Sequence, residues 1–143
     1  MKITWLLTGL LVLVALAIPF GLAIAFGNVS NVSSGSMAYW VGVPNHIKSV
    51  PIVSACENPL YSAKGRDGTA PARSRVSYTT QASVAHVQAV ITSQFTQIGC
   101  VASVAQPLGP ALSCPNGDEV VINVTQGDPC HAVTVGIYEL KTR

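Results

Sequence analysis

The apolar residues of this chain begin with one long run. Residues 3 to 27 read ITWLLTGLLVLVALAIPFGLAIAFG and include no charged side chain. A membrane-spanning helix needs roughly 20 apolar residues, whereas the apolar core of a secretory signal usually has about 7–15. The run therefore predicts an uncleaved transmembrane anchor within residues 1–27. The alternative is a signal sequence cleaved near Ala25 or Gly27, where small residues stand at the positions that a signal peptidase inspects.

The charges on either side of the run predict its orientation. Lys2 precedes the run, and the next charged residue is Lys48. Since positive charge is retained on the cytoplasmic side, we expect a single-pass protein of the cell membrane with a cytoplasmic amino terminus. The rest of the chain is then extracytoplasmic, or secreted if the run is cleaved.

Beyond the run, the clearest periodicity predicts a helix over residues 82–98. Apolar residues recur there at spacings of three and four: Val84, Val87, Ile91, Phe95 and Ile98. This spacing places them on one stripe of an amphipathic helix. Thr80 or Ser83 can cap its start, and Gly99 favours its end.

Alternating and β-branched residues predict strands at residues 50–55, 75–80, 100–106, 119–125 and 130–140. Gly, Pro, Asn and Asp make residues 57–74 a predicted loop. One helix among hairpin-linked strands indicates an α+β fold, with the helix packed on an antiparallel sheet. We place this extracytoplasmic domain at residues 50–143.

Residues 28–49 are rich in Ser, Asn and Gly, and we interpret them as a linker. Tyr39 and Trp40 stand in its middle. Aromatic pairs of this kind favour the membrane–water boundary, and the alternative is that both rings pack on the domain.

The number of cysteines indicates the redox environment of the protein. Only 10% of the 143 residues are charged, and there are four cysteines. In a small exported domain, four cysteines predict two disulfides with three possible pairings. A hairpin centred on the PLGP segment would bring Cys100 opposite Cys114, which leaves Cys56 for Cys130. Glycosylation triplets begin at three asparagines: Asn28, Asn31 and Asn123.

Half of the eight basic residues stand between residues 64 and 75: Lys64, Arg66, Arg73 and Arg75. They are open to two interpretations, as a contact for lipid phosphates or an acidic partner, or as a solvated loop. The net charge of +2 is too small to indicate nucleic acid. His46, His86 and His131 share no ligand spacing and there is no Cys-x-x-Cys, so we predict no metal and no cofactor.

The SGSM motif around Ser36 is the one candidate for catalysis. It resembles the nucleophile motif of type I signal peptidases, which also follows a membrane anchor. The resemblance implies that Ser36 is a nucleophile activated by Lys48 or His131, with Asp118 or Asp128 orienting the histidine. The chain departs from the family at Tyr39, where a proline is usual, and at VGVPNH, where a Gly-Asp pair is usual. We therefore interpret SGSM as part of the linker and predict no catalytic residue.

These observations favour a membrane-anchored extracytoplasmic accessory subunit or binding module without catalytic activity. Its expected partners are membrane lipid and another membrane or extracytoplasmic protein. One alternative is a signal-peptidase-like serine protease that uses Ser36. A second is a pilin-like filament subunit, since an apolar amino-terminal helix with a disulfide-bonded β domain resembles the general plan of pilins.

Overall fold

The computed structural model describes residues 28–103 and 110–140. The anchor predicted for residues 1–27 lies outside this part of the chain. Within the described ranges, none of the helices has the length and apolar character that a membrane crossing requires.

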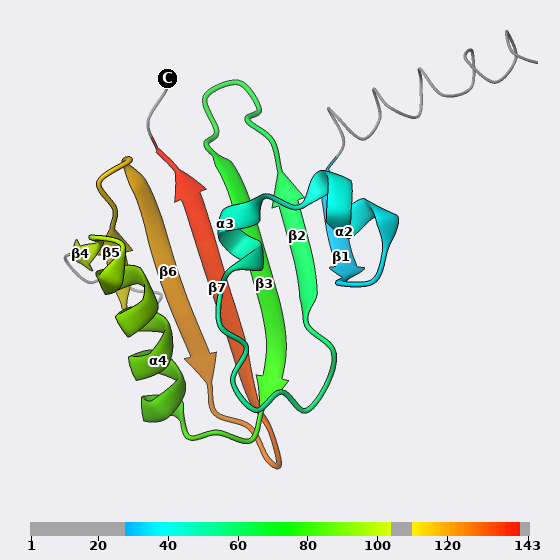
Figure 1. Ribbon diagram of the computed structural model, residues 1–143, viewed down its shortest axis with the longest axis vertical. Helices are drawn as coiled ribbons and strands as arrows, with labels where there is room; N and C mark the ends of the chain where they lie inside the picture. The colour runs from blue at the N-terminus through cyan, green and yellow to red at the C-terminus, as the bar shows by residue number, and fades with distance from the viewer. Residues whose placement is uncertain (1–27, 104–109, 141–143) are drawn as a thin grey trace, which may run out of the picture.

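A seven-stranded antiparallel sheet forms the body of the domain, in the order β1-β2-β3-β7-β6-β5-β4 (Figure 1). Its strands are β1 (Val29–Ser33), β2 (Leu60–Lys64), β3 (Ala72–Thr80), β4 (Val101–Ala102), β5 (Ala111–Ser113), β6 (Asp118–Thr125) and β7 (His131–Glu139). The helices are α2 (Met37–Gly42), α3 (Asn45–Lys48) and α4 (Val84–Gln97). The long strands β3, β6 and β7 occupy the middle of the sheet and contain most of its paired residues.

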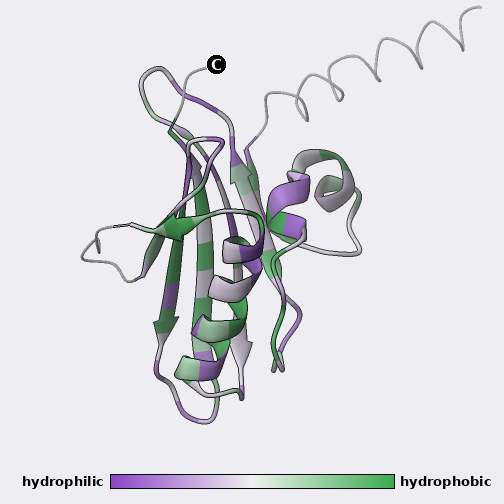
Figure 2. Cartoon of the chain, turned by 60° about the vertical axis from the view of Figure 1, so that its left-hand side comes forward, coloured by the Kyte–Doolittle hydropathy of each residue, from purple (hydrophilic) through white to green (hydrophobic). Residues whose placement is uncertain are grey.

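Helices α2, α3 and α4 of the described residues lie on the same face of the sheet, as Figures 1 and 2 show together. Helix α4 contacts β6, α3 contacts β3, and α2 contacts β1. Alternate residues of the strands meet these helices, so the ribbon of the central strands changes colour from one residue to the next in Figure 2. The resulting core includes the fully buried Val76, Ile91, Ile122 and Val135. No helix of the described part covers the opposite face.

The predicted α+β class, the antiparallel sheet and the two disulfides are confirmed. The predicted helix is α4, which begins after Ser83, whose hydroxyl accepts a hydrogen bond from the His86 amide. Gly99 follows it with φ of +92°, a conformation that favours glycine after a helix. Strands β6 and β7 coincide with two of the predicted strands, and β3 includes the predicted strand 75–80 but begins three residues earlier, at Ala72.

The predicted linker over residues 28–49 is wrong. Strand β1 pairs with β2, and the side chains of Tyr39, Val43 and Ile47 are buried in the core. These three residues are spaced four apart along the chain, but Tyr39 and Ile47 belong to two short helices that are separated by extended backbone at Val43 and Pro44. The Ser-, Asn- and Gly-rich composition of their neighbours conceals this spacing.

Two further predictions differ from the structure. Residues 50–55 form no strand beyond a single bridge from Ala55 to Thr80, because Pro51 cannot donate to a ladder and Ser54 has a positive φ of 43°. Conversely, the predicted loop over 57–74 contains β2. This strand is only five residues long and is flanked by turn residues, which hide its signal.

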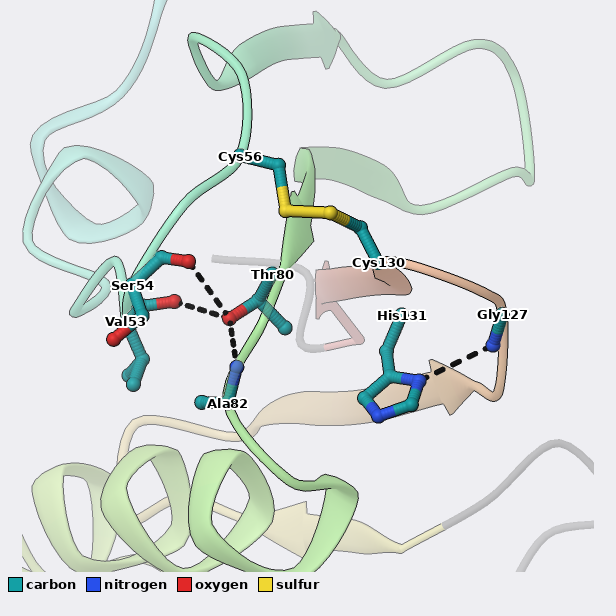
Figure 3. The surroundings of a disulfide bond; sticks show 8 residues. All are labelled: Val53, Ser54, Cys56, Thr80, Ala82, Gly127, Cys130 and His131. Carbon is teal, nitrogen blue, oxygen red and sulfur yellow. Dashed lines mark hydrogen bonds between the residues drawn. A yellow bond between two sulfur atoms is a disulfide. The ribbon is translucent and has the colours of Figure 1, made fainter.

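The two disulfides are Cys56–Cys130 and Cys100–Cys114, which is the pairing that the sequence predicted. Figure 3 shows that Cys56–Cys130 joins the segment before β2 to the residue before β7. Beside it, the Thr80 hydroxyl is fully buried and bonds to the carbonyls of Val53 and Ser54 and to the Ala82 amide. The disulfide and this hydroxyl together hold the irregular segment 50–56 against the sheet.

Candidate functional site

The uncovered face of β3 carries two adjacent arginines. Because side chains alternate along a strand, Ser74 and Val76 enter the core while Arg73 and Arg75 point to the other side. The register places Lys64 of β2 opposite Arg73. Three cationic side chains from the consecutive strands β2 and β3 thus gather on one face of the sheet.

A glycine on β7 makes room beside these cations. Gly136 stands opposite Arg75, and Tyr138 stands opposite Arg73. A Cβ atom on Gly136 would lie 3.2 Å from Cε2 of the Tyr138 ring, so any larger residue would displace the tyrosine. The Tyr138 ring therefore lies over Gly136 and forms one wall of a hollow beside the two arginines.

The hollow is part of a pocket of about 330 Å³. The pocket extends from residues 28–30, at the start of β1, across β2 and β3 to Gly136 and Tyr138. Its lining contains Lys64, Arg73 and Arg75, and none of its residues, all within the described chain, is an aspartate or glutamate. This volume is at the lower end of the range for small-molecule sites.

The positive charge of the pocket is only partly neutralised by its surroundings. Lys64 forms an exposed ion pair of 3.4 Å with Asp67, and Arg66, which is not a lining residue, donates to the Glu139 carbonyl. Among residues 28–103 and 110–140, neither Arg73 nor Arg75 has a hydrogen-bond or ion-pair partner. Two guanidinium groups are therefore available to an incoming ligand.

This arrangement is suited to a negatively charged oxygen group. Guanidinium groups donate paired hydrogen bonds to phosphate, sulfate or carboxylate oxygens. The Cα atoms of Arg73 and Arg75 are about 7 Å apart along the strand, so both side chains can reach one such group. The Tyr138 hydroxyl can donate a further hydrogen bond.

Ser36, the predicted alternative nucleophile, caps helix α2. Its hydroxyl donates to the Ser33 carbonyl at 2.9 Å and accepts from the Tyr39 amide at 3.2 Å. The Lys48 ammonium donates to the Trp40 carbonyl instead of to Ser36. The geometry of Ser36 is thus that of a helix cap.

The histidine and acids implied by the protease resemblance do not gather either. Asp118 and His131 lie at opposite ends of the β6–β7 hairpin, since Asp118 pairs with Glu139 and the other end pairs Thr125 with Ala132. Asp128 shares the hairpin turn with His131, whose Nδ1 accepts from the Gly127 amide at 3.2 Å (Figure 3). None of these groups approaches Ser36 through a hydrogen bond in the described chain.

The other histidines are dispersed. His46 shares a hydrogen bond of 2.8 Å with Ser74 inside the domain, and His86 lies exposed in the first turn of α4. Within the described residues, no three His, Cys, Asp or Glu side chains form a group that could hold a metal ion. The pilin-like alternative would be favoured by a helix that continues to about residue 45, but residues 29–33 form strand β1.

The three asparagines of the glycosylation triplets are all exposed: Asn28, Asn31 and Asn123. The Asn31 amide donates to the Ser62 hydroxyl at the edge of the sheet. Asn28 itself lines the pocket, so a glycan on this residue would stand at the pocket mouth.

Sequence reasoning noticed the basic residues but missed the site. It treated residues 57–74 as a loop, and it gave no role to Gly136 or Tyr138. The alternation of Arg73 and Arg75 with Ser74 and Val76 was the available signal, because it places both arginines on one side of a strand. Comparison with protein-family models, with curated proteins and with solved structures gave no match.

Proposed function

We propose that this chain is a membrane-anchored extracytoplasmic binding module, and that its pocket on the uncovered sheet face binds an anionic oxygen group of its ligand. Arg73 and Arg75 recognise the charge, and Tyr138 and the start of β1 border the bound group. The pocket lining offers basic side chains, hydroxyls and an amide for binding, and the module holds its ligand and leaves it chemically unchanged.

One observation carries the proposal. Arg73 and Arg75 face a pocket without an acidic lining residue and have no ion-pair partner in the described chain. Arginines on protein surfaces are readily paired with nearby carboxylates, and two unpaired neighbours repel each other. An anion placed between them would relieve this repulsion and gain charge-assisted hydrogen bonds.

The extracytoplasmic location is supported by separate features. The apolar run of residues 3–27 predicts the anchor. Two disulfides account for all four cysteines, and such bonds persist in oxidising compartments. The asparagines of the three glycosylation triplets are exposed, as glycan attachment would require.

The test is a titration of the full chain in neutral detergent micelles. Inorganic phosphate and glucose 6-phosphate serve as anionic probes, and glucose serves as the neutral probe. Amide chemical shifts are followed by NMR. We expect saturable shifts at Arg75, Gly136 and Tyr138 with both anions, and none with glucose. The Arg75→Gln variant is expected to bind at least about tenfold more weakly, because a charged hydrogen bond contributes about 1.5–3 kcal/mol.

Lys48→Gln is the matched control, since it removes one positive charge on the helix-covered face. It is expected to leave phosphate binding unchanged apart from a small non-specific electrostatic effect. If Arg75→Gln and Lys48→Gln weaken binding equally, or if the shifts are spread over the whole surface, the pocket is not the binding site.

A further inference from the structure

Helix α2 exposes an apolar stripe to its surroundings. Met37, Trp40 and Val41 are 70%, 68% and 61% exposed. Their spacing of three and four residues places them on one side of the helix. We call these three residues the α2 patch.

The patch is held outward by the packing of its own helix. Tyr39 and Val43, on the other side of α2, are buried in the core. Lys48 donates to the Trp40 carbonyl at 3.1 Å, and its ammonium lies 5.8 Å from the centroid of the Trp40 ring. The Trp40 ring also meets the buried Tyr39 ring edge-on at 5.5 Å. Trp40 therefore points away from the domain in a defined position.

The patch is next to the place where the apolar run joins the domain. Gly42, at the end of α2, packs directly against the Cγ2 atom of Val29. Val29 begins β1, only two positions after the apolar run ends at Gly27. Figure 1 likewise shows α2 beside the start of β1. A bilayer that holds residues 3–27 would therefore lie close to α2.

We propose that the α2 patch inserts into the interfacial layer of the same bilayer that holds the anchor, with Trp40 at the level of the lipid headgroups. Tryptophan favours this layer because its ring is apolar and its indole N–H still reaches water or lipid oxygens. Lys48, beside the ring, is placed to approach lipid phosphates while its stem stays on apolar surface.

The bilayer is the favoured occupant because the chain itself would keep it nearby. Three apolar side chains form a small contact for a free protein partner. A covalently attached membrane is present at high effective concentration, so even a weak contact is occupied. The contact would fix the orientation of the domain relative to the membrane. The inference rests on the anchor of the proposed function and is independent of the basic pocket.

The test uses the full chain in vesicles of phosphatidylcholine and phosphatidylglycerol. The chain has two tryptophans, Trp5 in the apolar run and Trp40 in the patch. Trp5→Phe leaves Trp40 as the only reporter, and Trp40→Phe leaves Trp5. We expect phosphatidylcholine brominated near the headgroup to quench most of the Trp40 fluorescence, and Trp40 emission to shift to shorter wavelength than in water.

A position at the other end of the sheet provides the matched control. Ala85 is exposed in the first turn of α4, which follows the end of β3 far from Val29. With both native tryptophans replaced by phenylalanine, Ala85→Trp is expected to escape quenching.

Each outcome separates the two proposals. If Trp5 is quenched and Trp40 is not, the anchor stands and the inference for the α2 patch is overturned. Blue-shifted but unquenched Trp40 identifies a protein occupant, such as a second copy, and also overturns it. If neither tryptophan is quenched, the anchor fails and the inference fails with it, whereas phosphate binding to the pocket is unaffected.

Discussion

Two hydroxyl groups on the same face of β3 have opposite environments. Thr80 is fully buried and its hydroxyl has both donor and acceptor partners. The Tyr78 hydroxyl is also buried, yet it has no hydrogen-bond partner among the described residues. Burial raises the pKa of Tyr78 above its ordinary value of about 10. The nearby Val53 backbone opposes this shift, although its contact lacks hydrogen-bond geometry.

These environments predict opposite effects of removing each hydroxyl at neutral pH. Tyr78→Phe should leave the free energy of unfolding unchanged or raise it, because it removes a polar group that lost its water on folding. Thr80→Val should lower the free energy of unfolding by about 1–3 kcal/mol, because it leaves the Val53 carbonyl and the Ala82 amide without their partner. Urea unfolding of the full chain in detergent compares the two, and an equal loss for both would contradict the assignment.

The same tyrosine predicts part of the alkaline behaviour. In the unfolded chain Tyr78 loses its proton near pH 10, whereas in the folded chain its pKa is higher. Well below pH 10 both states keep this proton, so Tyr78 makes no pH-dependent contribution to stability. Above that pH, the unfolded state releases the proton first and the free energy of unfolding falls. Tyr61, whose pKa is raised by burial and by the neighbouring Tyr39, adds to this fall. Tyr78→Phe should make the decline shallower.

At the scale of elements, the junction of α2 with β1 depends on a glycine. A Cβ atom on Gly42 would collide with Cγ2 of Val29. This contact sets how closely the helix approaches the edge strand. It also sets where the α2 patch stands relative to the start of β1.

Gly42→Ala should therefore destabilise the domain by about 1–3 kcal/mol, although alanine alone would favour a helix by up to about 1 kcal/mol. Amide exchange should accelerate in α2 and β1. Gly35→Ala is the control, since its Cβ would meet no atom within 4 Å. Val29→Ala, combined with Gly42→Ala, should recover part of the loss. If the double variant is no better than the single one, the collision is not the cause.

At the scale of the whole molecule, one disulfide links parts that are distant in the chain. Cys56 and Cys130 are 74 residues apart, whereas Cys100 and Cys114 are 14 apart. A crosslink restricts the unfolded chain more strongly when it closes a longer loop. Cys56–Cys130 also holds the irregular segment before β2 against the sheet.

Replacing Cys56 and Cys130 with alanine should lower the free energy of unfolding by about 4 kcal/mol. Replacing Cys100 and Cys114 should lower it by about 3 kcal/mol. The second variant should also lose packing energy, because Cys100 is only 1% exposed. Denaturant titration without reductant measures both. Amide exchange should rise around β4 and β5 in the second variant, and around residues 50–60 in the first. A loss below about 1 kcal/mol for Cys56–Cys130 would contradict its role.

The parts of the fold that the sequence predicted share a local signal. In α4, the buried Val87, Ile91 and Phe95 repeat with the period of a helix. The long strands β6 and β7 alternate clearly because one of their faces packs against the core. The edge strand β1 and its neighbour β2 are each only five residues long, so their pattern is too brief to recognise.

The sequence by itself determined the central strands, the main helix, the number of disulfides and the prediction of an anchor, because periodicity and composition are properties of neighbouring residues. Only the tertiary structure decided that Tyr39 is buried while Trp40 is exposed. It also decided that Arg75 of β3 pairs with Gly136 of the neighbouring strand β7. Such relations depend on which distant segments pair and in what register. A shift of one residue would turn both arginines into the core, and the folded sheet is what keeps them on its open face.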